Sequence, residues 1–198
     1  MSSASPRSRT EVRITGFGGQ GVVLAGHIIG RACAIHGGKN ATMIQSFGPE
    51  ARGSACSATL AISDGEVLYP YIGRPDILVA MSSEGYEKYR DELKDGGILL
   101  YERDLVHPTT GAMQEAHGIP STRIAESLGR TIVQNIVMVG FFAAVTKVVS
   151  HQALREAVTH SVPAGTEELN LAAFDLGFEY FGSQEGRLAK EQAVEVSA

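Results

Sequence analysis

The sequence carries a glycine-rich turn whose spacing suits the binding of a phosphate. Gly16, Gly18 and Gly21 follow the pattern Gly-x-Gly-x-x-Gly, directly after a short apolar run and directly before a helical pattern. In such a turn the first glycine permits the sharp bend, the second lets a diphosphate approach the backbone, and the third allows a helix to pack closely on a strand. The helix start adds N–H groups and the positive end of a dipole. The candidate binding residues are Gly16, Gly18, Gly19, Gln20 and Gly21. The alternative is a turn that serves packing or contact with a partner subunit.

The end of the second predicted strand disfavours a nicotinamide cofactor. A Rossmann site for NAD has an Asp or Glu at this point, where it binds the ribose hydroxyls. Here the strand ends Met43-Ile-Gln-Ser46, and the next acid, Glu50, lies beyond a glycine and a proline. Arg52 nearby suits a phosphorylated ribose, or any other ligand that carries a phosphate.

A second glycine-bounded loop, Gly48-Pro-Glu-Ala-Arg-Gly53, follows that strand. Glycines at both ends let the chain turn sharply while Glu50 and Arg52 project together. Arg52 can form a forked pair of hydrogen bonds to a carboxylate or a phosphate. The alternative is a local Glu–Arg ion pair that holds the loop. Glu50 and Arg52 therefore join the candidate binding residues.

Composition excludes several other kinds of chemistry. Two cysteines, Cys33 and Cys56, cannot hold a four-thiolate cluster, and no Cys-x-x-Cys pair is present for zinc or dithiol chemistry. The six histidines lack metal-ligand spacing, and no Gly-x-Ser-x-Gly elbow presents a serine nucleophile. A net charge of −5 gives no drive toward nucleic acid or an anionic membrane. We expect no metal, no nucleic-acid or membrane partner, and a cytoplasmic location.

The hydrophobic pattern predicts several strands. A hairpin is expected where a strand at 54–62 meets the turn signal Asp64-Gly65 and returns through Val67-Leu-Tyr69. The run Asp76 to Met81 is continuously apolar, as in a buried parallel strand. The remaining strands are predicted at 11–15, 41–46 and 98–101.

Helical spacing fills most of the rest of the chain. In the first predicted helix, 22–36, Gly26 and Gly30 share one face, which indicates close packing against a neighbouring element. The apolar run 132–149 has no polar face, so it is predicted to lie in the core or in a subunit interface. Further helices are predicted at 83–93, 122–128, 150–161 and 165–181.

These elements predict an α/β fold. We expect a single Rossmann-like domain with a mostly parallel, mixed sheet, one β-hairpin and a helical C-terminal third. The chain has 198 residues, and no linker divides it. The domain is predicted to span 11–182, between a disordered tail at 1–10 and a flexible tail at 183–198.

Several motifs, taken in order, resemble one family. Gly16-Phe-Gly-Gly-Gln-Gly-Val-Val-Leu-Ala-Gly26 is similar to the opening of the gamma subunit, or gamma domain, of 2-oxoacid:ferredoxin oxidoreductases. Ser46-Phe-Gly-Pro-Glu-Ala-Arg-Gly53 resembles the family's Ser-Tyr-Gly-Pro-Glu-x-Arg-Gly-Gly, with Phe47 and Ser54 as departures. The resemblance covers residues 11–181 and continues through Arg74-Pro-Asp-Ile-Leu-Val-Ala-Met81, Gly96-Gly-Ile-Leu-Leu-Tyr101, Asn135 and Asn170-Leu-Ala-Ala-Phe-Asp-Leu-Gly177.

The resemblance implies a function for the assembly. These enzymes convert a 2-oxoacid, CoA and an electron acceptor into acyl-CoA, carbon dioxide and reduced ferredoxin. Thiamine diphosphate with Mg and [4Fe-4S] clusters would lie on alpha, beta and, where present, delta subunits. This chain would hold no cofactor alone and have no catalytic residue. It would assist CoA binding, active-site architecture and assembly, with the glycine turn, Glu50 and Arg52 as contact residues.

The resemblance leaves the substrate open. The Gly-Pro-Glu-x-Arg-Gly form is closest to the 2-oxoglutarate branch, while pyruvate, branched-chain and aryl oxoacids are the alternatives. Two other functions are also open: a stand-alone nucleotide- or CoA-binding module, and a purely structural subunit whose glycine turn is only an interface.

Overall fold

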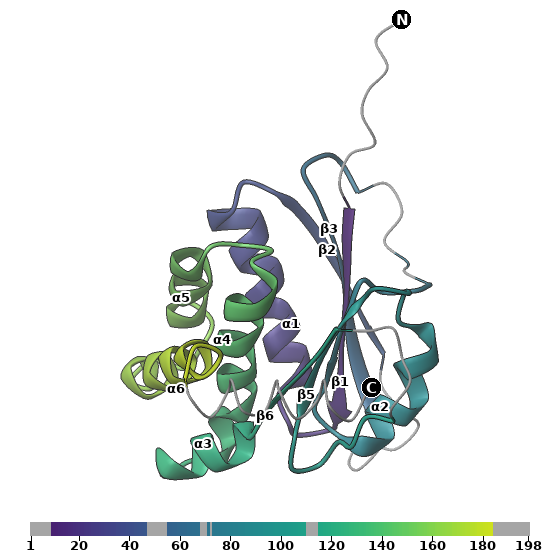
Figure 1. The fold of residues 1–198 in the computed structure, drawn as a ribbon. Helices are drawn as coiled ribbons and strands as arrows, with labels where there is room; N and C mark the ends of the chain where they lie inside the picture. Colours follow the sequence, from purple (N-terminus) through teal and green to yellow (C-terminus); the bar gives the residue numbers. More distant parts are fainter. Residues whose placement is uncertain (1–8, 47–54, 68–70, 72, 110–114, 184–198) are drawn as a thin grey trace, which may run out of the picture.

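A mixed β-sheet forms the centre of the protein (Figure 1). The computed structural model describes residues 9–46, 55–67, 71, 73–109 and 115–183. Within them the strands are β1 (Arg9–Phe17), β2 (Asn40–Ser46), β3 (Ala55–Ser63), β4 (Ile77–Ala80), β5 (Ile98–Glu102) and β6 (Glu115–Ile119). Their order in the sheet is β2-β3-β1-β4-β5-β6. β3 is antiparallel to both β1 and β2, while β1, β4, β5 and β6 pair in parallel.

Helices cover both faces of this sheet. The α-helices are α1 (Val22–Arg31), α2 (Ser83–Tyr89), α3 (Ser121–Ser127), α4 (Gln134–Thr146), α5 (His151–Thr159) and α6 (Glu167–Tyr180). Figure 1 shows α1 and α3 to α6 on one side of the sheet and α2 on the other. Short segments η1 (Ala32–His36), η2 (Arg90–Glu92) and η3 (Thr131–Val133) extend α1 and α2 and precede α4. The predicted α/β fold with a mixed sheet and a helical C-terminal third is confirmed.

The central strands are apolar because both of their faces are covered. All four residues of β4 are buried, as the continuous apolar run predicted. On β1, Val12 and Ile14 alternate with Arg13 and Thr15, and all four are buried. Arg13 is accommodated by an ion pair with Glu92 and lies 4.5 Å from the centre of the Tyr89 ring.

The two glycines of α1 allow this helix to lie close to the sheet. A Cβ atom at Gly26 would lie 2.9 Å from the Ala58 Cβ and 3.0 Å from the Met43 sulfur. At Gly30 it would lie 3.1 Å from Leu60. These approaches confirm the prediction of close packing, and they fix α1 over β2 and β3.

A close crossing of α4 and α6 holds the helical layer together. A Cβ atom at Gly140 would lie 2.9 Å from the Phe178 backbone nitrogen and would overlap the Phe174 carbonyl oxygen. Gly177 faces the Val137 backbone in the same way. Ten consecutive residues of α4, 135–144, are buried, which places this apolar helix in the core of the chain.

The predicted hairpin is wrong in its pairing. β3 ends at Ser63, and Val67 is in no strand, while Leu68 and Tyr69 lie outside the described residues. β3 instead pairs with β2, from Asn40 opposite Ser63 to Ser46 opposite Ser57. The bend at Asp64-Gly65 is present, but the edge that it would have offered to a return strand is taken by β2.

Two further differences concern strand bounds and an additional strand. β1 begins at Arg9, so the last two residues of the predicted disordered tail, Arg9 and Thr10, belong to the sheet. β6 was not predicted, because Glu-Ala-His-Gly-Ile has no apolar run. Position 118 requires a glycine, because a Cβ atom there would lie only 2.7 Å from the Tyr101 ring. Residues 1–8 and 184–198 of the predicted tails lie outside the described residues.

Candidate functional site

The glycine turn joins the end of β1 to the start of α1. Gly16 is still in the strand, and the turn proper begins after Phe17. Gly19 and Gly21 have φ of 101° and 73°, a region that L-residues with side chains rarely adopt. Gly21 is the N-cap of α1 and provides no capping side chain. Gly18 and Gly19 are exposed, so the turn presents backbone to the surface.

The Gln20 side chain ties the turn to two parallel strands. Its Oε1 accepts a hydrogen bond from the Phe17 N–H at 2.7 Å, and its Nε2 donates to the Met81 carbonyl oxygen at 3.0 Å. A Cβ atom at Gly16 would lie 2.6 Å from the Gln20 Oε1. Gly16 is therefore required to make room for this amide. The predicted role in a tight turn does not apply, because Gly16 has strand conformation.

Asn135 fixes the other end of the turn. It is 2% exposed at the start of α4, and its Nδ2 donates to the Gly21 carbonyl oxygen at 3.3 Å. A Cβ atom at Gly21 would lie 2.7 Å from the Asn135 Cγ. Gly21 therefore allows a close approach, but to Asn135 of helix α4 and not to a strand as predicted. Sequence reasoning noted Asn135 only as a motif position and assigned it no role.

A buried carboxylate organises the neighbouring strand end. Glu102, at the end of β5, is 1% exposed and accepts hydrogen bonds from Ser121 Oγ and from the Thr122 N–H at 2.9 Å. Thr122 Oγ1 also donates to Gln134 Oε1 at 2.9 Å, next to Asn135. These contacts link β5, α3 and α4 to the residue that holds Gly21. Sequence reasoning missed Glu102, because a single acid at a strand end carries no pattern.

The second glycine loop follows β2 in the sequence, and β2 ends at the same edge of the sheet as β1. Gly48 to Gly53, with Glu50 and Arg52, lie outside the described residues. The strands on either side are placed: Ser46 pairs with Ser57, which in turn pairs with Thr15, and Ala55 pairs with Phe17. The β2 end and the β3 start therefore reach the edge where β1 ends.

Three comparisons with known proteins give the chain its family. The pyruvate ferredoxin/flavodoxin oxidoreductase family matches residues 11–180. The chain belongs to this family. It is 46% identical over 184 residues to the 2-oxoglutarate synthase subunit KorC of Methanocaldococcus jannaschii, covering 90% of this chain and 97% of that one. It is 36% identical over 174 residues to the pyruvate synthase subunit PorC of Methanothermobacter thermautotrophicus, covering 85% and 94%.

A solved structure agrees with the family. The keto/oxoacid ferredoxin oxidoreductase gamma subunit from Geobacter sulfurreducens PCA superposes with a TM-score of 0.81 at 39% sequence identity. The match covers 92% of this chain and 98% of that one. The family and fold predicted from the glycine turn and the later motifs are therefore confirmed.

The topology of this family member separates the glycine turn from the end of β2. In a Rossmann site for NAD the second strand lies next to the first. Here β3 lies between β1 and β2, so two inter-strand spacings, about 9–10 Å, separate them. An acid at the end of β2 would not reach the ribose of a nucleotide held at the turn as in NAD enzymes. The end of β2 carries Ser46 and no carboxylate, which is consistent with this separation.

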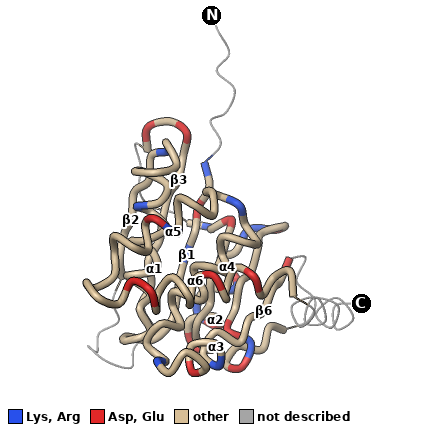
Figure 2. The backbone as a smooth tube through the Cα atoms, turned by 90° about the vertical axis from the view of Figure 1, so that its left-hand side faces the viewer, with Lys and Arg blue, Asp and Glu red and all other residues tan. Residues whose placement is uncertain are grey.

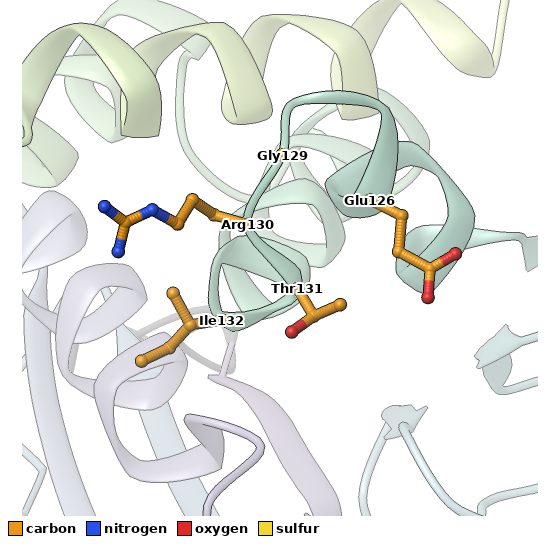
Figure 3. Close-up of a pocket in the computed structure, with 5 residues that line it drawn as sticks. All are labelled: Glu126, Gly129, Arg130, Thr131 and Ile132. Carbon is orange, nitrogen blue, oxygen red and sulfur yellow. The ribbon is translucent and has the colours of Figure 1, made fainter.

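A hollow of about 400 Å³ opens beside the start of α4 (Figure 3). It is lined by Glu126, Gly129, Arg130, Thr131 and Ile132. Figure 3 shows the Arg130 and Ile132 side chains extending to one side and Glu126 to the other. Ile132 is 74% exposed, although it lies only three residues before the buried Asn135.

The described residues carry charges of both signs and include no group that is placed to hold a metal ion. Lys and Arg residues are interspersed with Asp and Glu along the chain (Figure 2). Among the described residues no group of three or more His, Cys, Asp or Glu is placed to hold a metal ion. None of the described helices is both long enough and apolar enough to cross a membrane.

The two cysteines are expected to be unreactive. Both are buried free thiols. Burial raises the pKa of the Cys33 thiol to about 11, and it also raises the pKa of Cys56. Because the thiolate is the reactive form, we expect neither residue to react with iodoacetamide at neutral pH in the folded chain, and both to react in denaturant. Mass spectrometry of the labelled chain measures this. Rapid labelling of folded Cys33 would show that its helix is not packed as described.

Proposed function

We propose that this chain is the gamma subunit of a 2-oxoglutarate:ferredoxin oxidoreductase. The observation that carries the proposal is the 46% identity to a 2-oxoglutarate synthase subunit over 97% of that subunit. The identity to a pyruvate synthase subunit is lower, at 36%. The complex would convert 2-oxoglutarate and CoA into succinyl-CoA and carbon dioxide, and it would pass two electrons to ferredoxin.

The chain acts in this proposal without a catalytic residue or a cofactor of its own. Thiamine diphosphate with its Mg ion and the [4Fe-4S] clusters lie on alpha, beta and, where present, delta partners, where they supply decarboxylation and electron transfer. The gamma subunit shapes the site next to them. A cytoplasmic location belongs to the proposal too, and the two free thiols, Cys33 and Cys56, support it.

The edge at the ends of β1 and β4 is the part of the chain that faces CoA or the thiamine site. Exposed backbone at Gly18 and Gly19 and the start of α1 provide N–H groups for a phosphate. Gly16, Gln20 and Gly21 hold this backbone in place through Met81 and Asn135. Glu50 and Arg52 complete the site from the second glycine loop, with Arg52 as the partner of a CoA phosphate.

The substrate is tested on the purified complex with a set of oxoacids. We expect 2-oxoglutarate to reduce an electron-accepting dye with a kcat/KM at least roughly tenfold above those of pyruvate and branched-chain or aryl oxoacids, and only with CoA present. A preference for another oxoacid would overturn the 2-oxoglutarate assignment and leave the family unchanged.

An Arg52→Ala variant of the complex tests the CoA contact. Loss of a charge-assisted hydrogen bond is expected to raise the apparent KM for CoA roughly tenfold or more. Arg52→Lys keeps the charge and should lose less. Unchanged KM values for both CoA and the oxoacid would remove Arg52 from the site. Weaker assembly with normal substrate affinity would favour a purely structural role for the loop.

A further inference from the structure

β2 is an edge strand that lacks the usual protection against pairing. It lies at the end of the sheet, and within the described residues no strand pairs with its outer side. Its seven residues, Asn-Ala-Thr-Met-Ile-Gln-Ser, include no charged side chain and no proline. They pair with β3 in seven consecutive steps, without a bulge. Soluble proteins usually place charge, proline or a bulge on such an edge, so a bare edge of this length indicates that another chain covers it.

A groove runs beside this edge, between β2 and α1. Its volume is about 270 Å³. The side formed by α1 and η1 includes the small residues Gly26, Gly30 and Ala34, and the side formed by β2 includes Ala41. At its end Ile35 is 63% exposed. The groove can therefore receive apolar side chains of a strand that pairs with β2, since alternate side chains of that strand would point toward α1.

The rim of the groove is basic. Arg31 and His27, both on α1, line it, and the described lining contains no carboxylate. Most arginines of the described chain form ion pairs, for example Arg13 with Glu92 and Arg155 with Asp175. Arg31 takes part in none of the ion pairs of the described residues, and its Nε, like that of the ion-paired Arg13, is buried without a hydrogen-bond partner. An incoming carboxylate would complement this charge.

We propose that an extended, acid-bearing segment of a partner subunit adds a strand to β2, with its apolar side chains in the groove and an Asp or Glu on Arg31. The inference rests on the proposed function, because it places the partner within the oxidoreductase complex. Main-chain hydrogen bonds to β2 supply affinity, and the groove and Arg31 supply specificity.

A second copy of this chain fits the same edge less well. Pairing of β2 with β2 of a copy about a twofold axis would place both α1 helices on the same face of the joined sheet. Two basic rims would then lie side by side, with no acid in the described lining to separate them. The missing charge has to come from a different chain.

Hydrogen exchange on the intact complex tests the pairing. We expect amides of β2 to exchange at least roughly tenfold more slowly in the complex than in the chain alone, while amides of the buried strand β4 exchange alike in both. Equal exchange of β2 in both states would overturn the inference. If the wild-type chain joins a thiamine-containing complex with β2 unprotected, the inference fails and the proposed function stands. A chain that joins no such complex overturns both.

The identity and charge of the occupant are tested by substitution. Benzoylphenylalanine in place of His27 should cross-link to an acid-bearing segment of a partner subunit. A cross-link to another copy of this chain, or no cross-link, would contradict the inference.

Arg31→Glu is expected to weaken assembly roughly tenfold or more, and Arg31→Lys much less. Lys88→Glu, the same charge change at an exposed position of α2, is the matched control and should assemble normally. Normal assembly of Arg31→Glu would overturn the role of Arg31.

Discussion

Gly140→Ala is expected to lower the free energy of unfolding by about 3 kcal/mol. The added Cβ would overlap the Phe174 carbonyl oxygen and lie 2.9 Å from the Phe178 backbone nitrogen. Both neighbours are backbone atoms of α6, so a side-chain rotation cannot relieve the overlap and the two helices have to separate. Separation would open a cavity among buried apolar residues such as Phe141. Urea unfolding of the full chain, followed by circular dichroism, measures the change.

A glycine near the end of α6 provides the control for this variant. At Gly182 a Cβ atom would meet only the Glu179 carbonyl oxygen, at 3.8 Å. Gly182→Ala should therefore change the free energy of unfolding by no more than about 0.5 kcal/mol. If Gly140→Ala were as mild as Gly182→Ala, the close crossing of α4 and α6 would be wrong.

Gly21→Ala is expected to cost about 3 kcal/mol of stability and to lower the activity of the complex. Two effects add: the φ of 73° costs an alanine about 1 kcal/mol, and overlap with Asn135 costs about 2 kcal/mol more. Because Asn135 is buried, it cannot move aside freely, and the start of α1 has to shift. Chemical unfolding gives the first quantity, and dye reduction by the complex gives the second.

Gly129→Ala separates these two effects. Gly129 has a φ of 79° and no atom within 4 Å of an added Cβ, so its variant should cost only about 1 kcal/mol. Combining Gly21→Ala with Asn135→Ala should cost less than the sum of the two single changes, because the truncated residue no longer blocks the Cβ. Equal losses in Gly21→Ala and Gly129→Ala would contradict the packing of the glycine turn on α4.

The sequence predicted those elements whose signals are local. The spacing of Gly26 and Gly30 predicted both the helix and its close contact with the sheet. The continuous apolar run of β4 reflects burial on both faces. Each of these features is decided by residues close together in the chain.

Elements decided by distant contacts were not predicted. β3 pairs with β2, and the turn signal at Asp64-Gly65 does not indicate which edge of β3 is free to pair with another strand. β6 is a strand because it completes the parallel sheet beside β5, although its own sequence has weak strand preference. In the site, the spacing of the glycines identified the turn, while its supports at Met81, Asn135 and Glu102 come from residues more than sixty positions away.

The central claim, that this chain is the gamma subunit of a 2-oxoglutarate:ferredoxin oxidoreductase, is tested most directly by anaerobic affinity isolation from its native cells. Co-purifying chains are identified by mass spectrometry, and thiamine, iron and oxoacid-dependent dye reduction are measured with and without CoA. The account predicts stoichiometric partner subunits, bound thiamine and iron, and CoA-dependent activity with 2-oxoglutarate. A chain that is isolated without partners, thiamine or iron would contradict it.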